Sequence, residues 1–149
     1  MRTMPNDIFF TEVEHIIAEG GEVVLCVKGN SMRPFIRSDR TRVRFSMCDP
    51  QRLKRGDIVL FRYHDRHIMH RIVRREGDRL LLAGDGNYRK TEQCTTDDVA
   101  AIVTAVIRPN GRVIPCDSTI WRTASAIWIS LPQTVRRIIL GLLRRIGIK

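Results

Sequence analysis

The sequence predicts a mainly β fold, with coiled antiparallel sheets, a helix before them and an amphipathic helix after them. Two observations predict this fold class. The middle of the chain is a run of short strand-like segments separated by turn residues, with no helical pattern between them. Helical periodicity occurs only near residues 6–20 and from Pro132 onward. A parallel α/β fold is disfavoured because its strands alternate with helices.

The expected elements can be placed in chain order. A first helix should begin at residue 6 or 7 and end at the glycines at 20 and 21, because glycine readily takes the left-handed conformation beyond a helix end. Strands are expected at residues 22–28, 40–45, 58–63, 67–74, 79–83, 99–107 and 112–114. The third and fourth of these should form a hairpin. A loop is expected from residue 84 to residue 97 or 98.

Composition divides the chain into a helical leader at 1–21, a β domain at 22–117 and a basic amphipathic tail at 118–149. The length of 149 residues and the hydrophobic share of 43% suit one compact domain with a core. Pro132 suits the first position of the tail helix. Helical spacing is then kept by Val135, Ile138, Ile139, Leu142, Leu143 and Ile146.

The formal net charge of +10 favours an anionic partner. No acidic residue follows Asp117, and the basic residues after it are Arg122, Arg136, Arg137, Arg144, Arg145 and Lys149. Because this tail is also rich in Ile and Leu, it favours peripheral contact with a membrane over binding of nucleic acid. Trp121 and Trp128 precede the expected helix and suit a membrane interface. The alternative, a tail packed on the domain or on a second copy, stays open.

No uninterrupted apolar run reaches the ~18–20 residues that cross a bilayer, and the start of the chain lacks the pattern of a signal peptide. We therefore expect a location that is cytoplasmic or peripheral to the membrane. The four cysteines have no C-x-x-C spacing and no histidine at metal-ligand spacing: Cys26, Cys48, Cys94 and Cys116. We expect them to be small packed side chains, and we expect no metal and no cofactor.

Three polar residues are candidates for catalysis. Ser31 follows the first expected strand at a glycine-containing turn, which would expose its hydroxyl and its backbone N–H. A free serine hydroxyl is a weak nucleophile and needs a base, for which His70 on the fourth expected strand is the candidate. Asp85 lies between two glycines and could orient an imidazole, as in a catalytic triad. Each residue also has an ordinary explanation as a turn or packing residue.

Four short motifs, in this order, resemble those of the type I signal peptidase clan, which also holds the LexA-like self-cleaving repressors. They are Gly29-Asn30-Ser31-Met32-Arg33-Pro34, Arg55-Gly56-Asp57-Ile58-Val59, His70-Arg71-Ile72-Val73 and Gly84-Asp85-Gly86-Asn87. Each motif is weak alone, but all four in the family's order are specific. The resemblance implies the coiled β fold of this clan. It also implies a serine endopeptidase, a hydrolase whose substrate is a protein or peptide.

The resemblance also implies roles for individual residues. His70 followed by Arg71 resembles the histidine-base type of the endoplasmic reticulum and archaea, whereas typical bacterial enzymes use lysine. The strand that carries the family's base contains none of Lys28, Lys54 and Lys90. Ser31 would be the nucleophile, His70 the general base and Asp85 its orienting partner.

Relatives of the histidine type carry a further acidic residue near the base, and three candidates stay open here: Glu92, Asp97 and Asp98. Gly29 and Met32 are the candidate substrate-binding residues. Some relatives place an oxyanion-binding hydroxyl two positions before the serine, a position that Gly29 occupies here. The alternative function is that of a non-catalytic paralogue of the same fold, which binds a peptide or protein without cutting it.

Overall fold

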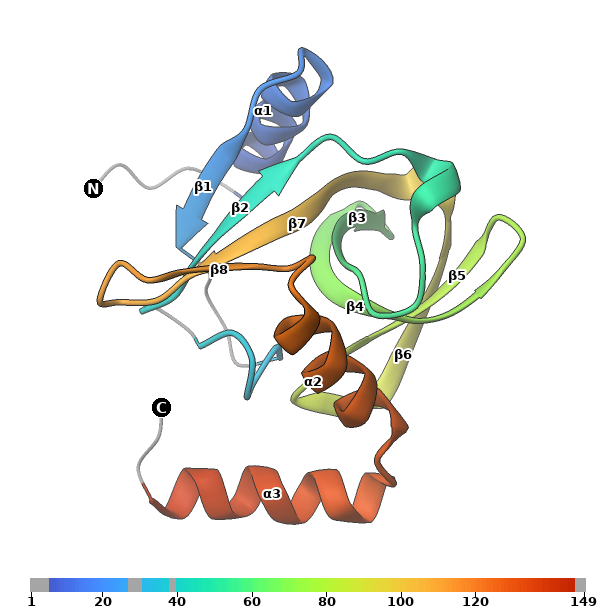
Figure 1. Cartoon of the computed structure of the whole chain (residues 1–149). Helices are drawn as coiled ribbons and strands as arrows, with labels where there is room; N and C mark the ends of the chain where they lie inside the picture. The colour runs from blue at the N-terminus through green and yellow to red at the C-terminus, as the bar shows by residue number, and fades with distance from the viewer. Residues whose placement is uncertain (1–5, 27–30, 38–39, 147–149) are drawn as a thin grey trace.

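The computed structural model describes residues 6–26, 31–37 and 40–146 (Figure 1). The helices are α1 (Asn6–Ala18), α2 (Thr119–Ser130) and α3 (Gln133–Arg145), with short 3-10 turns η1 (Pro50–Arg52) and η2 (Thr96–Asp98). The strands are β1 (Val23–Cys26), β2 (Arg42–Ser46), β3 (Ile58–Tyr63), β4 (Arg66–Glu76), β5 (Arg79–Gly84), β6 (Asn87–Thr95), β7 (Val99–Ile107) and β8 (Val113–Pro115).

All strand pairs of the sheet are antiparallel, in the order β1-β2-β7-β3-β4-β5-β6, and β8 pairs with β7. The sheet curls into a half-barrel, with α1 at one side and the two C-terminal helices at another (Figure 1). The predicted fold class, mainly β with coiled antiparallel sheets and terminal helices, is confirmed. The expected hairpin at residues 58–74 is the pair β3–β4, whose turn places His64 and Asp65 at positive φ.

Strand β3 shows how the core is arranged, because its side chains alternate between two hydrophobic clusters. Ile58 and Leu60 belong to the first cluster, together with Val13 of α1. Val59 and Phe61 belong to the second cluster, on the opposite face of the strand. Both faces of β3 are therefore buried, which explains its nearly continuous apolar sequence.

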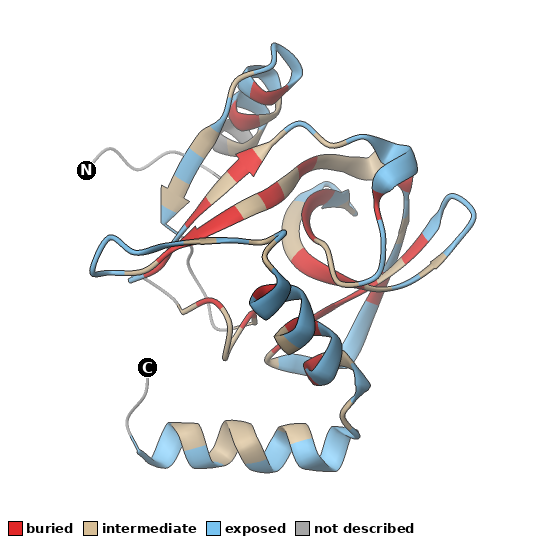
Figure 2. Cartoon of the chain, in the orientation of Figure 1, coloured by how far each residue is buried: buried red, intermediate tan, exposed pale blue. Residues whose placement is uncertain are grey.

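Two expectations about secondary structure are wrong. The expected loop from residue 84 to 97 or 98 contains β6, which pairs with β5 from Arg79↔Thr95 to Gly84↔Asn87. The chain here is polar because β6 lies at an end of the strand order and exposes many of its side chains (Figure 2). The tail holds two helices rather than one.

The tryptophans of the tail precede α3, as expected, but they themselves belong to a further helix, α2. Trp121 and Trp128 are each only 5% exposed. Ser118 caps the start of this helix by accepting a hydrogen bond from the backbone N–H of Trp121. Both indoles pack against Phe35, so a membrane interface is not their environment in this fold. The four cysteines are free, and Cys26 is exposed while the other three are partly buried.

Candidate active site

The site begins on β4, where three consecutive residues alternate between the two faces of the sheet. His70 pairs with Val59 across the β3–β4 ladder and therefore shares its face, that of the second core cluster. Ile72 is buried in the same cluster. Arg71, between them, pairs with Ile58 and faces the first cluster. His70 and Arg71 consequently meet different partners although they are neighbours in sequence.

The imidazole of His70 is held from one side by a buried carboxylate. His70 is 7% exposed and Glu92 on β6 is 2% exposed. His70 Nδ1 contacts Glu92 Oε1. The strand register explains the contact, because Ile72 pairs with Leu82 and Leu82 pairs with Glu92, which brings Glu92 to the face of His70. A carboxylate at Nδ1 favours the N–H on that nitrogen and leaves Nε2 as the proton acceptor.

The other ring nitrogen of His70 points to the segment that carries Ser31. A Cβ atom added to Gly84 would lie 2.9 Å from His70 Nε2 and 3.1 Å from Ser31 Cβ. The same Cβ would lie 2.4 Å from the backbone oxygen of Ser31. His70 Nε2 and Ser31 Cβ therefore converge on one point, and only a residue without a side chain leaves that point open.

A backbone hydrogen bond fixes Ser31 to the β5–β6 turn. The N–H of Gly86 donates to the carbonyl oxygen of Ser31 at 2.7 Å. Since Gly84 ends β5 in the same turn, the turn holds the serine segment close to the histidine strand. The structure thus brings together Ser31 and His70, which the sequence places 39 positions apart.

Asp85 is buried in this turn, but its carboxylate pairs with Arg71 rather than with His70. Arg71 Nε donates to Asp85 Oδ1 at 2.8 Å, and Arg71 Nη2 donates to Asp85 Oδ2 at 2.7 Å. Both residues are almost fully buried, and burial raises the pKa of the Asp85 carboxyl while the Arg71 guanidinium opposes the rise. The expected contact between Asp85 and His70 is replaced by this bidentate pair, and Glu92 takes the place beside the imidazole.

Helix α2 completes the surroundings of Arg71. Arg71 Nη1 donates to the hydroxyl of Ser125 at 2.7 Å, and also to the carbonyl oxygen of Gly56 at 2.9 Å. The guanidinium carbon lies 4.8 Å from the ring centroid of Phe35. Trp128 Nε1 donates to the backbone carbonyl of Asp85 at 3.1 Å. The turn beside Ser31 and His70 is therefore fastened to α2 through a buried arginine whose three side-chain nitrogens all donate hydrogen bonds.

The remaining predicted site residues lie elsewhere. Met32 is 2% exposed and packs in the first core cluster, which leaves little of its surface for a substrate. Asp98 accepts a hydrogen bond from the backbone N–H of Thr95 and caps η2, and Asp97 is exposed. Lys54 and Lys90 are exposed. Gly29 and Lys28 lie outside the described residues.

Sequence reasoning missed the buried partners of Arg71. The motif marks Arg71 only as the residue after His70, and it does not point to Ser125 or Trp128. One signal was present: Arg71 stands next to the apolar pair Ile72-Val73 on an expected strand, and an arginine that such a strand buries needs a buried acidic partner. The contacts from α2 had no such signal, because α2 was not expected as a helix.

The comparisons with known proteins agree with this fold. A family model described as Peptidase S24-like matches residues 5–107, which include α1 and the strands from β1 to β7. No curated protein matches the chain. The matched segment contains Ser31, His70 and Glu92, whereas β8, α2 and α3 follow it. The family suggests a hydrolase of the serine peptidase type. The match covers more than half of the residues of this chain, and the chain therefore belongs to the Peptidase S24-like family.

Proposed function

We propose that this protein is a serine endopeptidase in which Ser31 is the nucleophile and His70 is the general base, the histidine-base arrangement of its clan. The observation that carries the proposal is the convergence of Ser31 Cβ and His70 Nε2 on Gly84. Glu92 supports the same assignment, because a carboxylate at Nδ1 stabilises the imidazolium that forms when Nε2 takes a proton. Asp85 acts as a positioning residue through Arg71.

The reaction follows from these placements. Ser31 Oγ attacks the carbonyl carbon of the scissile peptide bond while His70 Nε2 takes the hydroxyl proton. The backbone N–H of Ser31 is one donor to the resulting oxyanion. The imidazolium then gives its proton to the leaving amine as the carbon–nitrogen bond breaks, which leaves an acyl ester on Ser31. A water molecule, deprotonated by His70, hydrolyses the ester, and the proton returns to Ser31.

The substrate is a protein or peptide segment in an extended conformation. Strand β1 lies at an end of the strand order and precedes the serine segment in the chain. An extended peptide can add to such an edge by β-augmentation, with main-chain hydrogen bonds that do not depend on the peptide sequence.

A fluorophosphonate probe tests the nucleophile and the base without knowledge of the substrate. The wild-type chain should be labelled at a serine, and Ser31→Ala should not be labelled. His70→Ala should lower the labelling rate about 10²–10⁴-fold, the usual contribution of a general base. The matched controls are Ser130→Ala and His15→Ala, which change an exposed serine and an exposed histidine outside the site.

Gly84→Ala tests the geometry itself. The added methyl group would overlap the Ser31 backbone and the His70 ring, so it should lower labelling strongly while the far-ultraviolet circular dichroism stays that of the wild type. Absence of labelling in the wild-type chain, or labelling that Ser31→Ala and His70→Ala leave unchanged, would contradict the proposal. The non-catalytic peptide-binding paralogue would then be favoured.

A further inference from the structure

Helix α3 leaves an apolar surface exposed on the outside of the molecule. Within the part of the chain that the structure describes, α3 has no buried residue. One side of the helix exposes four large apolar side chains, which we name the apolar stripe: Val135 at 37%, Ile138 at 54%, Leu142 at 55% and Ile146 at 69%. Their spacing of three or four residues places them on one helical face. The stripe is therefore a continuous surface rather than scattered apolar residues.

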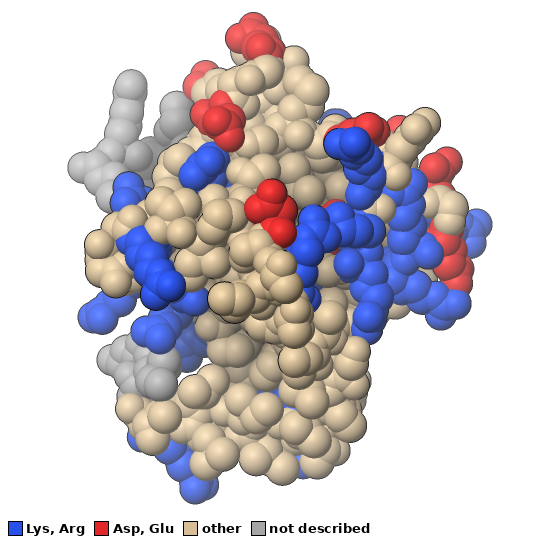
Figure 3. Space-filling view, viewed as in Figure 1, with Lys and Arg blue, Asp and Glu red and all other residues tan. Residues whose placement is uncertain are grey.

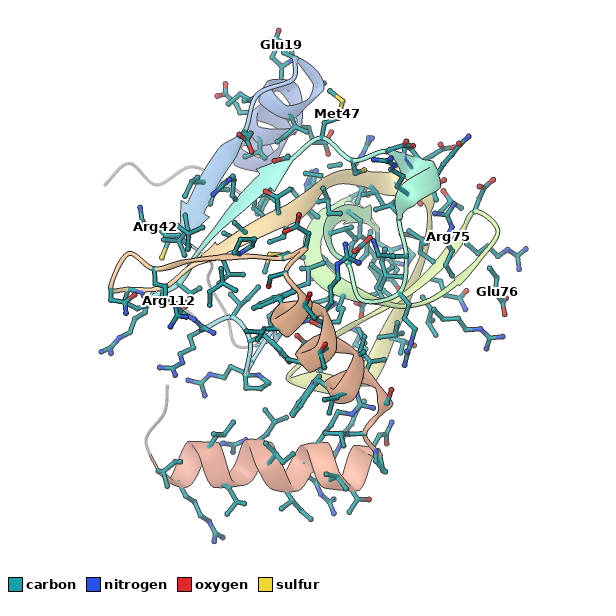
Figure 4. The ribbon with its side chains drawn as sticks, in the orientation of Figure 1. Glu19, Arg42, Met47, Arg75, Glu76 and Arg112 are labelled. Atoms are coloured by element: carbon teal, nitrogen blue, oxygen red, sulfur yellow. The ribbon has the colours of Figure 1, made fainter. Side chains whose placement is uncertain are left out.

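The helix has two apolar sides with different surroundings. Ile139, Leu140 and Leu143 are partly buried. Figure 4 shows α3 side chains directed toward α2 and others directed away from it. The α2 surface adds two exposed apolar side chains, Ile120 and Ile127. Figure 3 shows a broad uncharged area over the region of α2 and α3 in Figure 1, while blue and red atoms gather on the sheet.

The charges of α3 indicate which partner fits the apolar stripe. Arg137, Arg144 and Arg145 are exposed on the helix, and no acidic residue occurs in α2 or α3. By helical spacing, Arg145 lies beside the stripe, whereas Arg137 and Arg144 lie on the opposite side of the helix. A helix with one apolar side and one basic side matches the surface of an anionic bilayer, where the apolar side chains enter the acyl boundary and the arginines stay among the headgroups. Nucleic acid would contact the arginines but would leave the apolar stripe without a partner.

A second copy of the chain matches α3 less well. Stripe-to-stripe contact would bring Arg145, which lies beside the stripe in each helix, to the edge of the interface, and neither helix offers a carboxylate to pair with it. Like charges placed side by side at an interface oppose binding. The charge pattern therefore favours a lipid surface over a symmetric dimer.

The size of the helices favours a position on the membrane rather than across it. No single helix among the described residues is long and apolar enough to cross a membrane, whereas α2 and α3 together pass the length and composition test with a 118° bend between them. The 13 residues of α3 extend about 20 Å, less than the ~30 Å of a bilayer core. In α2, the two tryptophans and Ser125 are buried against the domain and are not available to lipid.

We propose that α3 docks this protein on anionic lipid bilayers, with the apolar stripe in the acyl boundary and Arg137, Arg144 and Arg145 at the headgroups. The docking does not depend on whether Ser31 is catalytic. Because α2 is fastened to Arg71 and Asp85 and α3 follows α2 directly in the chain, docking through α3 would bring the β5–β6 turn near the lipid surface.

Co-sedimentation of the full chain with vesicles tests the proposal. Binding to vesicles that contain phosphatidylglycerol should exceed binding to pure phosphatidylcholine vesicles and should weaken with salt. The stripe variant Ile138→Gln/Leu142→Gln should lower the partition coefficient at least tenfold. Arg144→Gln/Arg145→Gln should lower it about fivefold per arginine on anionic vesicles only. The matched control is Val24→Gln/Val113→Gln, the same kind of change at sheet residues that are 44% and 46% exposed.

Circular dichroism and thermal unfolding of each variant show whether it is folded. Wild-type binding by a folded stripe variant would overturn the proposal, as would equal losses in the stripe and sheet variants. Sedimentation equilibrium and salt-dependent binding to duplex DNA distinguish the other occupants. A dimer that the stripe variant dissociates, or DNA binding without vesicle binding, would overturn the proposal in favour of a second copy or of nucleic acid.

Discussion

Helices α2 and α3 follow one another in the chain and have similar lengths, yet they use their apolar side chains in opposite ways. Helix α2 buries Trp121, Ser125 and Trp128 against the domain, whereas α3 buries no residue (Figure 2). The more exposed helix is also the more highly charged one, because α2 carries one arginine and α3 carries four. Amphipathic spacing alone does not distinguish a helix of the core from a helix that contacts a partner. The buried polar contacts make the distinction here, because α2 bonds to the site through Ser125 and Trp128.

The largest effect should come from the arginine that joins α2 to the site. Arg71→Met leaves the Asp85 carboxylate buried without its counter-charge, so the free energy of unfolding should fall by about 3–5 kcal/mol. Urea unfolding at neutral pH measures the change.

A double variant separates the charge pair from simple packing. Arg71→Met/Asp85→Leu removes both charges and should recover much of the lost stability, since an apolar pair in place of a buried ion pair is often neutral. If the single variant is as stable as the wild type, Arg71 does not compensate Asp85. In that case, Arg71 would also not explain how α2 is connected to the site.

A smaller effect should follow when the hydrogen bond from α2 to the β5–β6 turn is removed. Trp128→Phe keeps an aromatic ring but removes the Nε1–H that donates to the carbonyl of Asp85. A buried carbonyl without a partner should lower the free energy of unfolding by about 1–3 kcal/mol. Because the turn also positions Ser31, fluorophosphonate labelling should slow as well.

Trp121→Phe is the matched control, because Trp121 is equally buried but meets Arg71 through the face of its ring. A phenyl ring retains that face, so the loss should be smaller. Equal losses of stability and of labelling in the two variants would show that ring volume, rather than the hydrogen bond to Asp85, accounts for the effect of Trp128.

The sequence predicts the fold best where burial gives a simple pattern. The bounds expected at residues 58–63 and 99–107 coincide with β3 and β7, both rich in buried apolar residues. The strand β6 was missed because it is a polar edge strand whose position depends on pairing with β5. The helix α2 was missed because its periodicity is weak and its packing partners lie far away in sequence.

In the site too, some residues can be predicted from the sequence, whereas the contacts of others depend on distant pairing. Ser31 and His70 stand in short motifs, so their sequence context marks them as candidates. The choice between Glu92, Asp97 and Asp98 needed the register of β6, which decides the face on which each side chain lies. Asp85 was expected beside His70, but the alternation of β4 gives His70 and Arg71 opposite faces and brings Asp85 to Arg71. Such an outcome follows from three-dimensional pairing and not from motif order.

The smallest effect should come from the apolar stripe of α3. Leu142→Ala changes a side chain that is 55% exposed, so without lipid it should alter the free energy of unfolding by no more than about 0.5 kcal/mol. The same substitution at Leu80, which is 1% exposed in the second core cluster, should lower it by about 2–5 kcal/mol. Urea unfolding at two protein concentrations measures both variants. A loss above about 1 kcal/mol for Leu142→Ala that grows with protein concentration would show that the stripe is covered by another copy, and α3 would then resemble α2.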